Sequence, residues 1–112
     1  MTIKLVAVDM DGTLLTDDKK ITERTRRAVR AATERGLAVA LCTGRTLPEC
    51  ADVKAFLPEV RYAVTSNGAR VWDMWENRVL TEHCLTPECS RTLAARLIGF
   101  KGMLAAFSGG RI

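Results

Sequence analysis

Short apolar runs alternate with amphipathic segments along the first 65 residues. The runs 3–8 and 37–42 are almost entirely apolar, which is typical of strands buried on both faces in a parallel sheet with helices on either side. Residues 62–65 form a third, shorter run of the same kind. Strand, helix and strand at this spacing predict right-handed parallel crossovers. The pattern therefore predicts an α/β fold.

Two helices are expected between these strands. The first begins after Thr22, a favourable N-cap, and ends at Gly36, in the position favoured for a left-handed cap. The second opens with Thr46 and Glu49, which resemble a capping box, and runs through Phe56. The residues expected on the inner faces of the two helices are Ile21, Thr25, Ala28, Val29, Ala32, Cys50, Val53 and Leu57.

The pattern becomes antiparallel after residue 69. Residues 70–74 and 78–82 flank a turn at 75–77, which predicts a hairpin in which Trp72 and Trp75 are packing residues.

The last part of the chain predicts one more helix and one more strand. The helix begins at Thr86 and Pro87 and ends at Gly99. Residues 103–107 are expected to form the strand, and His83 is expected to be structural or exposed. The apolar face of the helix consists of Leu93, Ala94, Leu97 and Ile98.

Two carboxylates follow the first strand. Side chains alternate along a strand, so Asp9 and Asp11 leave the sheet on the same side if the extended geometry persists through Met10, and Gly12 then breaks the strand. Ligands of open α/β sheets bind at the carboxyl ends of the strands. The position of the pair therefore favours a chemical role.

The pairing also has a chemical logic. An ionised aspartate is a competent nucleophile toward phosphorus, and a second carboxyl group nearby can protonate the leaving oxygen and later accept a proton from water. A hard cation such as Mg²⁺ suits these oxygen ligands. The alternatives are a solvated turn or a calcium loop. The calcium loop is excluded because its glycine and glutamate positions are Leu14 and Lys20 here.

The second strand ends in Thr43, Gly44 and Arg45, on the same predicted sheet edge as Asp9. The threonine hydroxyl can donate to a phosphate oxygen, and the glycine lets backbone amides approach it. The arginine either contacts phosphate or substrate, or pairs with a surface acid.

The chain has 112 residues, 47% of them hydrophobic and 27% charged, which is ordinary for one small globular domain. No apolar run is long enough for a membrane span or a signal peptide, so we expect a cytoplasmic protein. The formal charge of +4 comes largely from arginines on one helix face, without interleaved aromatic residues, which argues against nucleic-acid binding. These arginines are Arg24, Arg26, Arg27, Arg30 and Arg35.

Cysteine and histidine usage argues against a zinc site and against a disulfide framework. The four cysteines contain no Cys-x-x-Cys pair, and His83 is the only histidine. We expect reduced thiols at Cys42, Cys50, Cys84 and Cys89.

Three segments resemble motifs of the haloacid dehalogenase superfamily, whose members are mostly Mg²⁺-dependent phosphatases. The segments are 9–15 (DMDGTLL), 41–45 (LCTGR) and 65–69 (TSNGA), in the order and spacing of the family. The resemblance is closest to the Cof-type branch of sugar-phosphate and related phosphatases. It covers nearly the whole chain.

The resemblance implies a phosphatase of small phosphorylated metabolites, such as sugar phosphates, that uses Mg²⁺. It makes Asp9 the nucleophile that forms an aspartyl-phosphate and Asp11 the general acid and base, with both as metal ligands. Thr43 would hold phosphate. The turn at 66–69, in which Asn67 and Gly68 can take positive φ, would contribute substrate-side contacts.

The resemblance also implies a partial Rossmann-like three-layer core with parallel strands, a β-hairpin and the start of an inserted α+β cap. Residues 1–84 would be the first half of the core and 85–112 the opening of the cap. A lysine and an acidic Gly-Asp loop that the family places later in its sequence have no counterpart here. Without them the site should be badly impaired.

A three-stranded partial sheet would leave a hydrophobic edge, which self-association, strand exchange or a separate polypeptide would cover. Two other functional hypotheses remain open. One is a catalytically silent module that binds phosphate or Mg²⁺ or forms an interaction surface. The other is a phosphomutase or phosphotransferase that uses the same aspartyl-phosphate.

Overall fold

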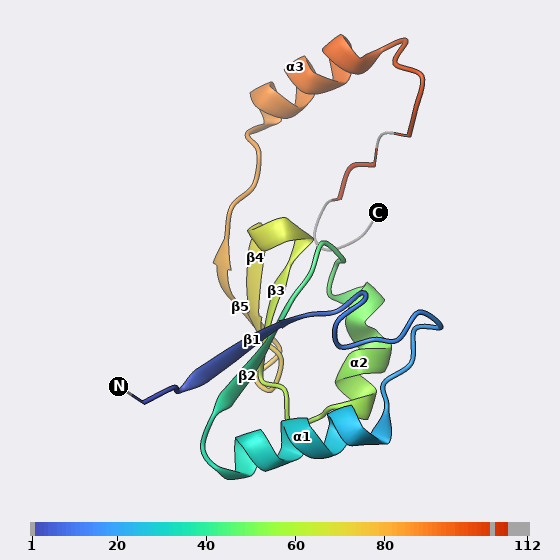
Figure 1. Ribbon diagram of the computed structural model, residues 1–112. Coiled ribbons are helices and arrows are strands. Elements are labelled where there is room, and N and C mark those ends of the chain that lie inside the picture. Colours follow the sequence, from blue (N-terminus) through green and yellow to red (C-terminus); the bar gives the residue numbers. More distant parts are fainter. Residues whose placement is uncertain (1, 104, 108–112) are drawn as a thin grey trace.

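A computed structural model describes residues 2–103 and 105–107 of the protein (Figure 1). These residues form an α/β arrangement built on a five-stranded sheet in the order β1-β2-β3-β4-β5. Its strands are β1 (Leu5–Asp9), β2 (Ala38–Cys42), β3 (Tyr62–Thr65), β4 (Arg70–Asp73) and β5 (Arg78–Glu82). The helices are α1 (Glu23–Glu34), α2 (Ala51–Phe56) and α3 (Pro87–Leu97), with short 3₁₀ turns η1 (Pro48–Cys50) and η2 (Ser66–Gly68).

The first three strands are parallel and end together. Asp9 pairs with Cys42, and Cys42 pairs with Val64, so the segments after all three strands leave the sheet at one edge. The hairpin strands β4 and β5 then continue the sheet antiparallel to β3. The three strands predicted within residues 3–65 and the hairpin are confirmed, and the hairpin covers the β3 side that a three-stranded sheet would leave open.

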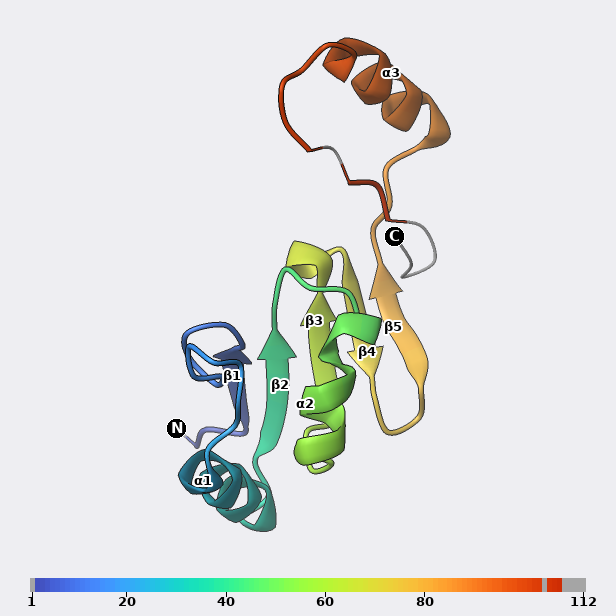
Figure 2. The same ribbon diagram turned by 90° about the vertical axis from the view of Figure 1, so that its right-hand side faces the viewer.

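Helices α1 and α2 lie on the same face of the sheet, and Figure 2 shows α2 over β3 and β4. Right-handed crossovers that both step in the direction β1 to β3 place their helices on one face. The prediction that the first strand is buried on both faces is therefore wrong. Leu5 is 52% exposed, Ala7 is also exposed, and only Val6 and Val8 are half-buried, because β1 pairs with β2 alone and its outer face is uncovered by the described residues.

One hydrophobic core fills the space between the covered face and the helices. Val29 of α1 and Val53 of α2 pack there with Leu41 and Leu57, which are fully buried. The predicted inward residues of the second helix are thus confirmed. The expectation for Ala28 is wrong, because it lies on the exposed flank of α1.

The predicted cap at Thr22 forms, because its hydroxyl accepts a hydrogen bond from Thr25 N at 3.1 Å. Only the Glu49 half of the predicted capping box forms: Glu49 Oε2 accepts from Thr46 N at 2.7 Å and from the Thr46 hydroxyl at 2.8 Å, so this hydroxyl donates to Glu49 and does not cap the turn. Gly36 takes the expected left-handed φ of 82°. The segment after Thr46 is split into η1 and α2 rather than forming one continuous helix.

The hairpin turn is fixed by a buried carboxylate. Asp73, 1% exposed, accepts from the backbone N–H groups of Trp75 and Glu76 and from Arg61, whose Nη2 is 2.7 Å away. Trp72 packs against the core as expected. The packing role expected for Trp75 is wrong, because this residue is 60% exposed, although its Nε1 donates to Pro58 O.

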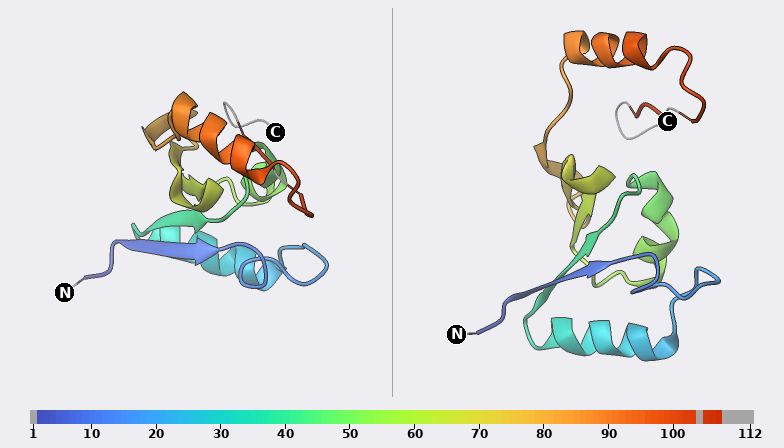
Figure 3. Two further views of the ribbon diagram at one scale, coloured as in Figure 1. Left: turned by 90° about the horizontal axis from the view of Figure 1, so that it is seen from above. Right: turned by 45° about the horizontal axis from the view of Figure 1, so that its top comes forward.

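Helix α3 stands away from the sheet (Figures 1 and 3). Thr86 caps it as predicted, and its apolar residues Leu93 and Ile98 are exposed. Of the expected strand at 103–107, residue 104 lies outside the described residues and the others adopt no strand. Within the described part of the chain, no helix has both the length and the apolar character to cross a membrane.

Candidate active site

Three loops meet at the carboxyl ends of the parallel strands. Residues 10–16 follow β1, 43–47 follow β2, and 66–69 follow β3. The parallel register places Asp9 beside Cys42 and therefore close to the start of the second loop at Thr43. This edge holds every residue that the sequence predicts for the site.

The chain leaves the extended conformation directly after Asp9. Met10 lies in a turn and is fully buried, and its carbonyl accepts a hydrogen bond from Leu15 N at 2.8 Å. The condition for strand alternation to place Asp9 and Asp11 on the same side, extended geometry through Met10, is therefore not met. A tight loop, with Gly12 at φ 75°, sets the direction of Asp11 instead of strand alternation.

The Asp11 carboxylate is held by two cations. Arg45 binds it through both oxygens, with Nε 2.9 Å from Oδ2 and Nη2 2.7 Å from Oδ1, and Lys19 Nζ lies 2.8 Å from Oδ1. Of the two alternatives for Arg45, the structure shows pairing with an acid, and that acid belongs to the candidate site.

These contacts govern the ionisation of Asp11. Hydrogen bonding from Arg45, followed by that from Lys19, lowers the pKa of the Asp11 carboxyl from 3.8 to about 2. The same ion pair raises the pKa of Arg45. At neutral pH Asp11 in this arrangement is a carboxylate that can accept a proton but has none to give.

The second loop presents Thr43. Its side chain is nearly buried, its N–H donates to Val64 O at 2.9 Å, and its hydroxyl oxygen accepts from Arg45 N at 3.1 Å. A hydroxyl that accepts one hydrogen bond still has its own hydrogen to donate. Thr43 is therefore rigidly placed with a donor to offer at the sheet edge.

The third loop packs directly on the second. Asn67 N donates to Thr43 O at 3.2 Å, and a Cβ built on Gly44 would lie 3.0 Å from Asn67 Oδ1. Gly44 is thus favoured by a close approach to the Asn67 side chain rather than by its φ. Asn67 and Gly68 take the predicted positive φ values of 54° and 95°.

Lys19 belongs to this cluster but does not follow from the sequence, where it lies in a polar connection. Its backbone is left-handed, with φ 61°, and its N–H donates to Thr16 O. The turn is closed further by Thr16 N, which donates to Lys20 O at 2.9 Å. A non-glycine residue in this conformation is uncommon, and it is visible only in the structure.

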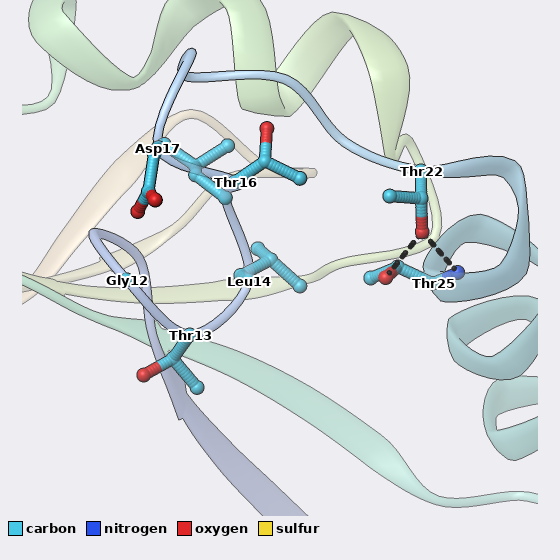
Figure 4. A pocket seen from close by; sticks show the side chains of 8 residues that line it. Gly12, Thr13, Leu14, Thr16, Asp17, Thr22 and Thr25 are labelled. Carbon is cyan, nitrogen blue, oxygen red and sulfur yellow. Dashed lines mark hydrogen bonds between the residues drawn. The ribbon is translucent and has the colours of Figure 1, made fainter.

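A pocket of about 410 Å³ lies under the first loop (Figure 4). It is lined by the hydroxyl side chains of Thr13, Thr16, Thr22 and Thr25 and by Asp17. The Thr22 hydroxyl is engaged with Thr25 N and Oγ1 in capping α1. This pocket therefore lies where the chain passes from the first loop to α1, and one of its hydroxyl groups is already used to cap that helix.

The candidate donors for a metal ion are Asp9, at the end of β1, and Asp11, in the first loop. Among residues 2–103 and 105–107, no three or more His, Cys, Asp or Glu side chains gather in a way that could hold a metal ion. The four cysteines are free thiols, and Cys50 is the buried one.

Comparison with known proteins gives a consistent result. The sequence profile of the haloacid dehalogenase-like hydrolases matches residues 6–111. Over 71 residues the chain is 44% identical to the 5-amino-6-(5-phospho-D-ribitylamino)uracil phosphatase YcsE of Bacillus subtilis, covering 63% of this chain and 28% of that protein. Over 70 residues it is 39% identical to an HMP-PP phosphatase of Serratia proteamaculans, covering 62% of this chain and 26% of that protein.

A solved structure shares the fold. A haloacid dehalogenase-like hydrolase of B. subtilis superposes with a TM-score of 0.77 at 26% identity, over 87% of this chain and 34% of that one. The chain thus spans about a third or less of the length of the relatives it matches.

Proposed function

Because the chain belongs to the haloacid dehalogenase-like hydrolases, we propose that it carries the nucleophile half of a phosphatase site for small phosphorylated metabolites. The observation that carries the proposal is the common edge of β1, β2 and β3. It brings Asp9, Thr43 and the loop at Asn67 together.

The reaction has two steps on this edge. An Asp9 carboxylate oxygen attacks phosphorus, the bond from phosphorus to the leaving oxygen breaks, and the leaving oxygen takes a proton from Asp11. Water then attacks the aspartyl-phosphate, the bond to Asp9 breaks, and Asp11 takes the proton from water. The Thr43 hydroxyl and the backbone at Gly44 hold the phosphate oxygens.

The remaining site residues support binding. Arg45 lies close enough to Asp11 to contact a phosphate ester placed beside it, while Asn67 and Gly68 face the same edge from the third loop. We assign Arg45 to the phosphate and Asn67 and Gly68 to the substrate side.

The ionisation of Asp11 sets a condition on the first step. Its pKa of about 2 leaves it ionised while Arg45 and Lys19 bind it. Asp11 can donate a proton only after these cations turn to the dianionic phosphate, which raises its pKa. Substrate binding and activation of the acid are therefore coupled in this proposal.

The donor set fits Mg²⁺. This ion is commonly bound by one or two carboxylates together with substrate phosphate, and Asp9 and Asp11 are both exposed at the edge. When bound, Mg²⁺ would neutralise charge on the phosphate oxygens. Arg45 and Lys19 compete for the same Asp11 oxygens, so we expect weak binding in the absence of substrate.

Two of the relatives named above support a substrate class. Both are phosphatases, one of them of a phosphorylated uracil derivative. We propose a small phosphate monoester for this chain.

A catalytically silent phosphate-binding module is the second candidate. The observation that favours it is that the described residues bring no third acidic group to the two aspartates, while both Asp11 oxygens are occupied by cations.

Phosphate release from p-nitrophenyl phosphate and a panel of sugar phosphates, with and without Mg²⁺, tests the proposal. Because the chain carries only the nucleophile half of the site, we expect slow Mg²⁺-dependent turnover, which Asp9→Asn abolishes. Turnover equal to that of Asp9→Asn would reject the phosphatase and leave the silent module.

A further inference from the structure

A second pocket, which we name the side pocket, lies between the first loop and α2. Its volume is about 320 Å³, and it is lined by Leu15, Lys19, Ile21, Arg45, Val53 and Phe56, among others. Lys19 and Arg45 are the two cations that bind Asp11. The side pocket therefore opens directly beside the proposed general acid.

Two cations line the end of the side pocket beside Asp11, which we call its mouth. Lys19 and Arg45 share the single carboxylate of Asp11, while Lys20, which also lines the pocket, pairs with Asp18. The Thr16 turn holds Lys19 in its left-handed conformation and fixes its position relative to Asp11. A mouth of this kind suits the phosphate end of a ligand.

The interior of the side pocket is apolar. Leu15 and Val53 are buried at 5% and 3% exposure, and Ile21 is half-buried. Phe56, by contrast, is 61% exposed, although it lines the pocket beside these residues. An exposed aromatic side chain next to an apolar floor offers a stacking surface for a flat ring.

Two carboxylates on the α2 side limit the ligand further. Glu49 and Asp52 both line the side pocket. They disfavour a second anionic group on the organic part of a ligand and favour a neutral ring or one with N–H donors.

We propose that the side pocket binds the organic group of the phosphate ester and selects a planar aromatic or heteroaromatic ring. The inference rests on the proposed function. If Asp11 protonates the leaving oxygen, the group attached to that oxygen lies on the side of Lys19 and Arg45, where the side pocket opens. Phe56 is then a specificity residue.

Binding of stable phosphonates to the 112-residue chain tests this without turnover. Titration calorimetry compares phenylphosphonate with methylphosphonate for the wild type, for Phe56→Ser and for Phe100→Ser. Phe100 is the matched control, since it is 67% exposed and lies after α3, outside the side pocket. Circular dichroism checks that each variant is folded.

We expect phenylphosphonate to bind about tenfold more tightly than methylphosphonate, with Phe56→Ser removing most of this preference and Phe100→Ser leaving it intact. Equal affinities, no binding of either phosphonate, or a preference that survives Phe56→Ser would each overturn the inference. Failure of the proposed function can be distinguished from failure of this inference. A Phe56-dependent preference for phenylphosphonate, found together with no phosphate release, would support the side pocket as a binding site and reject the phosphatase activity.

Discussion

Replacing Arg45 with methionine should raise the pKa of Asp11 from about 2 toward its ordinary value of 3.8. The whole interval corresponds to a change of about 60-fold in proton affinity. Hydrogen bonding from Arg45 is the largest cause and that from Lys19 the second. Arg45→Met should therefore raise the pKa of Asp11 by more than Lys19→Met does, and in the double variant the pKa of Asp11 should lie near 3.8.

The sign of the effect on stability follows from the lowered pKa. A carboxyl group with a lower pKa in the folded than in the unfolded state stabilises the fold above its unfolded pKa, and this stabilisation is lost as the pH falls through the folded value. For Asp11 this stabilisation is lost as the pH decreases from about 4 to about 2. In Arg45→Met this part of the pH dependence should shrink.

Carbon-detected NMR of the aspartate carboxyl groups, without Mg²⁺, measures the titration directly. Arg30→Met is the control, because Arg30 Nε binds Glu59 Oε1 at 3.0 Å and takes no part in the Asp11 cluster. An Asp11 that still titrates near 2 in Arg45→Met would refute the reasoning.

Two further predictions concern stability, both measured by urea unfolding. Gly44→Ala should lower the free energy of unfolding by about 1 kcal/mol, because the added Cβ lies 3.0 Å from Asn67 Oδ1. Adding Asn67→Gly should restore this stability, and a loss that persists in the double variant would contradict the contact. Leu57→Ala should cost about 2–5 kcal/mol because Leu57 is fully buried, whereas Phe56→Ala, at the exposed neighbour, should change stability by about 0.5 kcal/mol or less; similar costs at both positions would contradict the assigned core.

The features that the sequence predicts correctly depend on neighbours along the chain. The Thr22 hydroxyl accepts a hydrogen bond from the backbone N–H of Thr25, three residues later, and the Glu49 carboxylate accepts one from the N–H of Thr46, three residues earlier. Asn67 and Gly68 are residue types that tolerate positive φ. Such interactions are decided within one turn of chain, so residue order is enough to find them.

The features that the sequence misses depend on distant contacts. The ion pair between Arg45 and Asp11 joins residues 34 positions apart in the sequence. Lys19 reaches Asp11 only because the turn at Thr16 directs the chain back toward the first loop. The exposure of Leu5 follows from which strand lies at the sheet edge. Apolar composition alone does not distinguish an edge strand from a central one.

The central claim is that Asp9 is the nucleophile, and trapping the phosphorylated chain tests it most directly. The protein is mixed with Mg²⁺ and p-nitrophenyl phosphate, quenched in acid and digested, and the peptides are analysed by mass spectrometry. The account predicts one phosphoryl group on Asp9 in the wild type and none in Asp9→Asn. A wild-type Asp9 without a phosphoryl group, or a phosphoryl group on another residue, would contradict it.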